Sequence, residues 1–204
     1  MCARYTPPGE MKDVERTFRA QLKIAKDAAF KPVIYPGYQA PVVLGSDENR
    51  RIEDRFWGLM YNMRGKRDPT KLLEKLAQNA VSETIHEKKT FKGAWEKSQR
   101  CVIVAENFFE PSPEHGGWAL FKDAKAPLLA IAGIYDKTTF KGLPREAFTM
   151  LTCAPNPFMA VIHDRMPVIL NASDVDEWLS VDTSPEEAKR LLKPYAGNLV
   201  AASA

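Results

Sequence analysis

Residues 100–110 read RCVIVAENFFE, and three segments of the same kind follow: GWALFK (117–122), PLLAIAGIYD (127–136) and EAFTMLTCA (146–154). All four are rich in β-branched and aromatic residues, and Pro or Gly residues lie at their boundaries. This composition is typical of strands. We therefore predict that they form the central sheet or barrel of the fold.

The flanking sequence predicts further strands and several helices. PVVL (41–44) and RIEDRFWGL (51–59) are expected to be short strands with a polar turn between them. Residues 60–71, MYNMRGKRDPTK, are expected to form a basic, exposed loop. Helices are expected in three places: over 14–29, where Val14, Phe18, Leu22, Ala25 and Ala29 recur at helical spacing, over 71–80, and over 89–98.

Two short helices are expected near the C-terminus. Ser173 can cap DVDEWL (174–179), while Ser184, Pro185 and Glu187 have the N-cap, N1 and N3 pattern that begins a helix. The tail from 197 to 204 carries no further signal. With no internal repeat or linker, residues 1–204 are interpreted as one α+β domain. We expect a mostly antiparallel curved sheet or open barrel with flanking helices.

Composition limits the function only broadly. The 204 residues are 45% hydrophobic and 27% charged, as in an ordinary globular protein, and 29 basic against 26 acidic residues leave a net charge of +3. Such a chain would not coat duplex DNA non-specifically, although it could carry a local basic stripe. With no signal-peptide core and no membrane-length apolar run, we expect a cytoplasmic monomer, nucleoid-associated if the source is a bacterium or phage.

The cysteines and histidines show neither a disulfide framework nor a metal site. Cys2, Cys101 and Cys153 are odd in number and have no CxxC spacing, and the three histidines are widely separated. The chain also lacks the GxxxxGK[ST], GxGxxG and GxSxG motifs. We therefore expect no metal and no cofactor, with Cys101 and Cys153 as buried, unpaired packing residues.

Cys2 would carry unusual chemistry if Met1 were removed. The residue would then hold an α-amine and a thiol, a 1,2-aminothiol. With an aldehyde, the amine forms a Schiff base and the thiol closes onto it as a five-membered thiazolidine. An α-amine with a pKa of about 7.7–8.0 is nucleophilic near neutral pH. A Cys after the initiator Met is nevertheless common, so this position alone does not establish the function.

Three other polar residues lie near predicted strand or helix ends. Asn79, Glu110 and His163 are of the types needed for acid–base chemistry. Each also has a purely structural interpretation: Asn79 as a helix C-cap, Glu110 as a surface carboxylate at a strand end, and His163 as a histidine bonded to the backbone.

Taken together and in order, the motifs resemble the SRAP family (SOS-response-associated peptidase). MCARY resembles the family opening MCGR, PGYQAPVV resembles its APxxxxPV segment, and FWGL resembles RWGL. QNAVSET is similar to NARAET, RCVIVAENFFEP to RCLIPADGFYEW, and LLAIAGIYD to FAFAGLWE. TMLTCAPNPFMAVIHDRMPVIL is similar to TILTTxANxxxxxIHxRMPVIL. The matches cover most of residues 1–170, and the last is long and specific.

The resemblance implies a protein that crosslinks to abasic sites in single-stranded DNA through its N-terminal cysteine and so shields the lesion. Carried over to this sequence, Cys2 would be the nucleophile, and Asn79 would orient the Cys2 amine or the sugar hydroxyls. Glu110 would move protons during ring opening and Schiff-base formation, and His163 would assist formation and reversal of the adduct. Arg4 would contact phosphate, and Arg165, in the IHDR run, is also assigned to DNA binding. The family's name implies possible self-cleavage that removes Met1, or a lyase activity.

This chain departs from the family pattern where DNA would be held. Val81 replaces an arginine, Pro111 replaces the aromatic residue after the glutamate, and Met60, Tyr61, Asn62 and Met63 follow WGL in place of a proline and a tryptophan. How these departures affect activity stays open. We expect Tyr61 or Met63 to provide a platform for an unpaired base. Replacement charges are expected from Arg64, Lys66, Arg67 and Lys71.

Two other functions remain open. Cys2 could be the nucleophile of a thiol peptidase or amidohydrolase, with its own amine or His163 as base and Asn79 at the oxyanion. The chain could instead be a non-catalytic DNA-binding or phage accessory protein that has kept only the fold. A stable adduct with abasic single-stranded DNA that needs Cys2 would separate the first interpretation from both alternatives.

Overall fold

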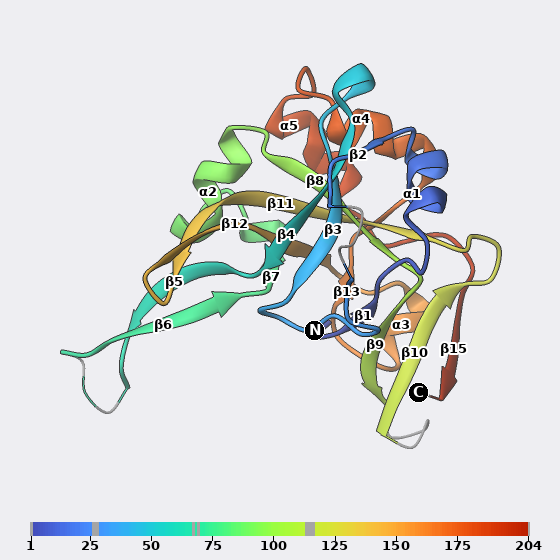
Figure 1. Ribbon diagram of the computed structural model, residues 1–204. Coiled ribbons are helices and arrows are strands. Elements are labelled where there is room, and N and C mark those ends of the chain that lie inside the picture. The colour runs from blue at the N-terminus through green and yellow to red at the C-terminus, as the bar shows by residue number, and fades with distance from the viewer. Residues whose placement is uncertain (1, 26–28, 67, 69, 113–116, 204) are drawn as a thin grey trace.

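Five strands close into a barrel at the centre of the computed structural model, which describes residues 2–25, 29–66, 68, 70–112 and 117–203 (Figure 1). They are, in order around the barrel, β12 (Leu143–Cys153), β11 (Leu129–Phe140), β8 (Arg100–Ala105), β3 (Gln39–Leu44) and β4 (Arg51–Trp57). Neighbours are antiparallel, except that β4 pairs in parallel with β12 and so closes the ring. The expected α+β fold with a curved sheet or barrel is confirmed, and the barrel is closed.

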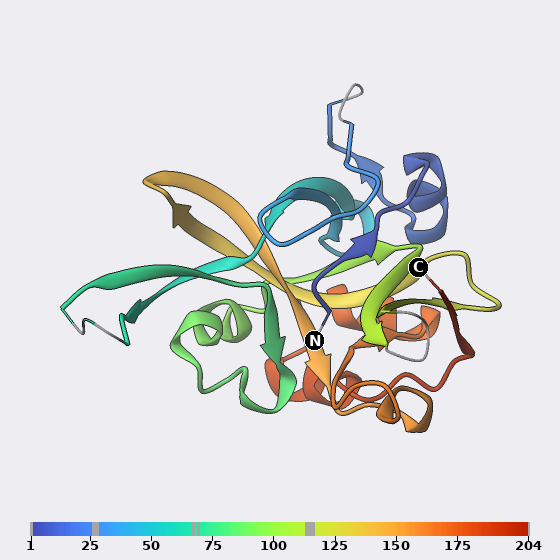
Figure 2. The same cartoon turned by 90° about the horizontal axis from the view of Figure 1, so that it is seen from below.

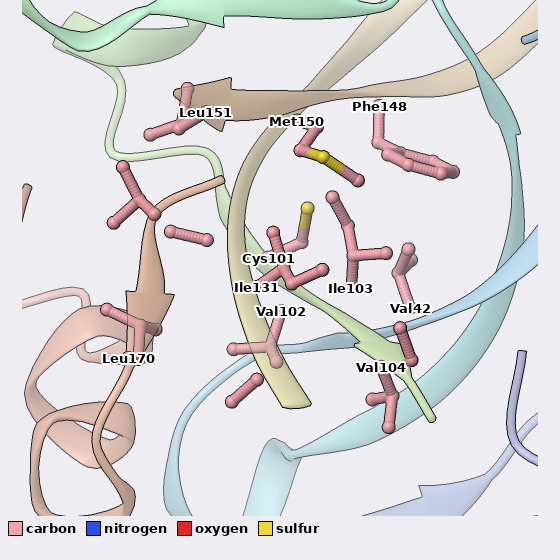
Figure 3. Packing of buried hydrophobic residues seen from close by; sticks show 14 of the residues in the cluster. Val42, Cys101, Val102, Ile103, Val104, Ile131, Phe148, Met150, Leu151 and Leu170 are labelled. Atoms are coloured by element: carbon pink, nitrogen blue, oxygen red, sulfur yellow. The ribbon is translucent and has the colours of Figure 1, made fainter. Parts of the chain in front are cut away.

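The barrel core follows from the alternation of side chains along its strands. Cys101 and Ile103 of β8 face inward toward Met150 of β12, and all three are completely buried (Figure 3). Gly133 on β11 pairs with both Cys101 and Met150, and leaves room there for the larger side chains. Cys101 and Cys153 are buried and free, as predicted. The barrel therefore excludes water and provides a rigid frame for the strand ends.

A second sheet packs beside the barrel. It consists of β1 (Tyr5–Thr6), β9 (Asn107–Ser112), β10 (Gly117–Asp123) and β15 (Leu199–Ser203), all antiparallel. The remaining strands are β2 (Gln21–Leu22), β5 (Leu59–Arg64), β6 (Leu72–Ala77), β7 (Asn79–Val81), β13 (Met166–Pro167) and β14 (Ile169–Leu170). Of these, β5 and β6 form a hairpin that projects from the body of the protein (Figure 1).

The helices are short and lie around the sheets. They are α1 (Met11–Phe18), α2 (Lys89–Glu96), α3 (Pro157–Ala160), α4 (Val175–Leu179) and α5 (Pro185–Ala188). Arg100 links the barrel to the C-terminal helices, because its buried guanidinium donates to the carbonyls of Trp178, Ser180 and Thr183 at 2.6 Å each. Three charge-assisted bonds satisfy much of this buried cation and attach the α4–α5 region to β8.

The helix predicted over 14–29 was wrong beyond its first five residues. Helix α1 ends at Phe18, because Arg19 has a left-handed conformation with φ of 50° and turns the chain away. Leu22 then lies in β2, which pairs in parallel with β4. Ala25 is exposed, and residues 26–28 lie outside the described part of the chain. The apolar residues that are spaced as in one helix therefore belong to two elements, the short helix α1 and the edge strand β2.

The loop predicted over 60–71 was wrong for 60–64, and the helix predicted over 71–80 was wrong as well. Strands β5 and β6 pair as a hairpin, with Tyr61 opposite Lys75 and Met63 opposite Leu73, and Asn79 begins β7. Strand β7 adds in parallel to β12, so Asn79 is a strand residue and not a helix cap. Cross-strand pairing has overridden a weak helical propensity.

Smaller differences appear in three other places. RCVIVAENFFE is two strands in different sheets, divided at Glu106, and the tail forms β15 beside β10. Ser173 does not cap α4, because it lies in a 3₁₀ turn and its hydroxyl donates to Asp174. The capping box of Ser184 and Glu187 at α5 is confirmed. In the described part of the chain, every helix is too short or too polar to span a membrane.

Candidate active site and DNA-contact residues

The start of the chain lies at the junction of the two sheets, where two of the expected site residues meet Cys2. Figure 2 shows this segment beside β12, with β7 and β9 on either side of it. Asn79 on β7 donates from Nδ2 to the carbonyl oxygen of Cys2 at 2.8 Å. Its other amide atom, Oδ1, is buried and has no hydrogen-bond partner among the described residues. The donor side of Asn79 thus fixes the Cys2 backbone and leaves an acceptor in the site.

The Cys2 thiol is protected. Cys2 is 1% exposed, and its Sγ donates to the carbonyl of Arg4 at 3.4 Å. Burial, and to a smaller extent the nearby charge of Glu110, raises the pKa of this thiol to about 12. At neutral pH the sulfur is therefore a neutral thiol. A neutral thiol becomes a good nucleophile only as its proton is removed, so this sulfur needs a base when it reacts.

Glu110 is completely buried on β9, close enough to Cys2 for their charges to interact. Burial raises the pKa of this carboxyl from 4.5 to about 7, and repulsion from Asp164 acts in the same direction. The cause is mainly desolvation of the charged form. A carboxyl with this pKa exchanges protons readily near neutral pH, as a general acid or base must.

His163 lies in the turn after α3, beside Asp164. The backbone N–H of Arg165 donates to His163 Nδ1 at 3.0 Å, and Asp164 Oδ1 lies 2.8 Å from the same nitrogen. Partial burial lowers the pKa of His163 below 6.5, although Asp164 opposes that shift. Because the charge of Asp164 reaches Glu110, the structure places this turn near the carboxyl.

The expected DNA-contact residues fall into two groups. Tyr61, Met63, Arg64 and Lys66 belong to the projecting hairpin, whereas Arg67 lies outside the described residues. Tyr61 and Met63 share one face of β5, and Arg64, at the alternate position, faces the other way. The hairpin therefore does not present its expected contacts on one surface. Lys75, which was not expected as a contact, lies opposite Tyr61 on the same face.

Arg4 and Arg165 are differently engaged. Arg165 forms a two-pronged ion pair with Glu83, at 2.8 and 2.7 Å, and also donates to the carbonyl of Thr152. This pairing lowers the pKa of Glu83 to about 2. Arg4 has no such partner and lies over the rings of Phe109 and Trp118.

One departure from the family pattern, Pro111, lies beside an aromatic residue on the next strand. Pro111, where the resemblance predicts an aromatic side chain, pairs with Trp118 across β9 and β10. Sequence reasoning did not single out Trp118, because an aromatic residue in a strand is most often part of a core.

Among the described residues, no group of three or more His, Cys, Asp or Glu side chains is placed to hold a metal ion.

Comparison with known proteins agrees with the motifs. A family model described as "SOS response associated peptidase (SRAP)" matches residues 1–204. The abasic site processing protein YoqW of Bacillus subtilis is 32% identical over 205 residues, which cover 96% of this chain and 88% of YoqW. The abasic site processing protein HMCES of Gallus gallus is 28% identical over 210 residues, which cover 86% of this chain and 62% of HMCES.

Solved structures share the fold. A protein from Bordetella bronchiseptica superimposes with a TM-score of 0.81 and 26% identity, over 100% of this chain and 99% of the other. A protein from Bacteroides thetaiotaomicron has the same fold, with a TM-score of 0.78 at 24% identity, over 98% and 90% of the two chains. Since the family model spans the whole sequence and the barrel is shared, this chain belongs to the SRAP family.

Proposed function

We propose that this protein captures abasic sites in single-stranded DNA as a covalent adduct of Cys2, after Met1 has been removed. The observation that carries the proposal is the assembly of Cys2, Asn79 and Glu110 at the junction of the two sheets. The relatives named as abasic site processing proteins support the choice of substrate. Shielding of the lesion during the response to DNA damage follows from such a bond.

The chemistry needs only the aminothiol and a proton carrier. The Cys2 amine adds to the ring-opened sugar aldehyde, and loss of one water molecule gives a Schiff base. The thiol sulfur then adds to the imine carbon, and its proton ends on the nitrogen, which closes the thiazolidine. While Met1 is attached, the Cys2 nitrogen is an amide and cannot begin this sequence. Removal of Met1 therefore precedes capture.

Glu110 is assigned the proton transfers. Its pKa of about 7 lets it donate a proton to the opening sugar and to the departing water, and then accept one back. Asn79 holds the Cys2 backbone and offers its buried Oδ1 to the Cys2 amine or to a sugar hydroxyl. His163, whose pKa partial burial lowers below 6.5, is assigned to assist formation and reversal of the adduct.

The DNA contacts are proposed for Arg4, Arg165, Tyr61, Met63 and Lys66. Arg4 is assigned to a phosphate, and Arg165 would exchange its ion pair with Glu83 for one. Tyr61 is 38% exposed and offers a ring on which an unpaired base can stack. Because Arg64 faces away from Tyr61, its assignment to DNA is weaker than that of the others.

The peptidase alternative is less well supported. A thiol peptidase attacks as a thiolate, which requires a lowered pKa. Burial instead raises the pKa of the Cys2 thiol to about 12. In the amine-first order the α-amine makes the first attack, and the thiol closes a ring within the same residue as its proton passes to the imine nitrogen, so no free thiolate is required.

The decisive experiment is incubation with single-stranded DNA that carries one abasic site, followed by denaturing electrophoresis. We expect a heat- and detergent-stable adduct with the mature protein. Cys2→Ser should form at most a Schiff base that borohydride can trap, because a hydroxyl closes the ring far less favourably. Cys153→Ala, the matched control at another buried thiol, should crosslink normally.

Two further variants test the order of steps. One extra residue before Cys2 should preserve the fold and the non-covalent affinity yet give no thiazolidine. Glu110→Gln should slow adduct formation by about 10²–10⁴-fold without abolishing binding. A protein with an extended N-terminus that crosslinks at the normal rate through Cys2 would contradict the mechanism and favour simple thiol addition or the peptidase alternative.

A further inference from the structure

Trp118, near the start of β10, is an exposed tryptophan that is not part of the hydrophobic core. Trp118 is 36% exposed, whereas the other three tryptophans, Trp57, Trp95 and Trp178, are at most 2% exposed. The pairing of β10 with β9 places Trp118 opposite Pro111 and the next residue, Ala119, opposite Glu110. Trp118 and Glu110 are therefore on opposite faces of the same two-stranded unit.

Arg4 lies on the same side as Trp118 and has no anionic partner. Its guanidinium carbon is 4.2 Å from the centre of the Trp118 ring and 4.4 Å from that of Phe109. Among the described residues, nothing accepts a hydrogen bond from the Arg4 side chain, and its Nε is buried. Arg4 is half-buried, so its guanidinium still reaches solvent while the two rings hold it in position. The guanidinium is held flat and ready to bind an anion.

We propose that Trp118 and Arg4 form a binding site for one nucleotide that neighbours the lesion. The base stacks on the open face of the Trp118 indole, and the phosphate accepts hydrogen bonds from Arg4. This proposal rests on the proposed function for its substrate, single-stranded DNA. The chemistry of the site fits a nucleotide because it combines one flat apolar surface with one adjacent planar cation.

The position of Trp118 and Arg4 relative to Cys2 and Glu110 decides whether they bind the abasic nucleotide or its neighbour. Arg4 follows Cys2 by two residues, and its carbonyl accepts the hydrogen bond from the Cys2 thiol. Glu110, which serves the reacting sugar, points to the other face of β9. The lesion and the stacked base are thus separated by the thickness of one strand. Trp118 holds a flanking base and not the abasic residue itself.

The tryptophan distribution provides a direct assay. We titrate the protein with a single-stranded oligonucleotide that carries a tetrahydrofuran abasic analogue, which has no aldehyde and cannot crosslink. Because Trp118 is the one exposed indole of the four, stacking should quench the protein's fluorescence, and Trp118→Phe should remove the quenching. No quenching at saturating DNA, with binding verified by anisotropy of a labelled oligonucleotide, would overturn the proposal.

Affinity measurements separate binding from packing. By anisotropy, Trp118→Ala should weaken binding by about 5- to 150-fold, the range for loss of one base–aromatic stack, while Trp118→Phe should stay near wild type. Arg4→Gln should reduce the slope of log affinity against log salt by about 0.7, as expected for one lost phosphate contact on a single strand. Leu143→Ala, at an exposed apolar residue at the start of β12, should change neither quantity.

The outcomes also distinguish this inference from the proposed function. Quenching of Trp118 without an adduct on aldehyde-bearing DNA would leave the nucleotide site standing and remove the covalent mechanism. A Cys2-dependent adduct with unchanged affinity in Trp118→Ala would do the reverse. In that case the contact between Arg4 and Trp118 would serve only to hold the N-terminal segment on β9.

Discussion

Replacing Glu110 with glutamine should stabilise the fold at alkaline pH while it slows the chemistry. The carboxyl is completely buried, and burial raises its pKa from 4.5 to about 7. Between these pH values the native protein keeps a proton that the unfolded chain has lost, so the free energy of unfolding falls as pH rises through the window. The pKa difference, 7 minus 4.5, is 2.5, which at 1.36 kcal/mol per pKa unit amounts to about 3 kcal/mol.

Glutamine has the shape of the protonated carboxyl and does not ionise, so the variant should escape this loss. The free energy of unfolding of Glu110→Gln minus that of wild type should therefore grow by about 3 kcal/mol between roughly pH 4 and pH 8. Urea unfolding at a series of pH values measures it, with the exposed Glu48→Gln as matched control. Parallel curves for wild type and Glu110→Gln would show that Glu110 ionises normally in the native protein, and the argument for its acid–base role would be lost.

Three other changes test the barrel, a helix cap and the hairpin. Gly133→Ala should lower the free energy of unfolding in urea by about 1–3 kcal/mol, because its Cβ would lie 2.9 Å from Cys101 Sγ. Ser184→Ala removes the capping box of α5 and should cost about 1 kcal/mol, seen as a lower Tm with unchanged DNA affinity. Lys75→Gln should weaken single-strand binding and its salt dependence more than Arg64→Gln does, since the two residues face opposite ways; equal anisotropy losses would contradict this.

The barrel strands were predictable because both of their faces are buried. Residues 101–105 are apolar without interruption, with Cys101 and Ile103 toward the interior and Val102 and Val104 on the outer face. The shortness of this apolar run and its β-branched residues favour a strand over a helix. Closure of the barrel could not be predicted from the sequence in the same way. It depends on two residue pairs between β4 and β12, and these strands are far apart in the sequence.

The hairpin was not predictable from local pattern. Residues 71–80, KLLEKLAQNA, have leucines at spacings that fit a helix as well as a strand, and their lysines and glutamates favour helix. The pairing with β5, and the addition of Asn79 to β12 through β7, decide the outcome. Such contacts lie beyond the range of a sequence window, so the local propensity gave the wrong element even though Asn79 was correctly chosen as a candidate.

The proposed nucleotide site depends on the register between β9 and β10, which cannot be predicted from the local sequence. Pro111 removes an aromatic side chain from β9, and Trp118 restores one on the same face because the two residues are directly paired. A slip of one residue between β9 and β10 would turn the indole to the face of Glu110 and away from Arg4. The compensation therefore requires a specific pairing between residues on opposite sides of a turn. Compared at position 111 alone, the sequence predicts that an aromatic contact to DNA has been lost. The pairing of Pro111 with Trp118 predicts instead that the contact is kept by Trp118. The fluorescence titration of Trp118 distinguishes these two predictions.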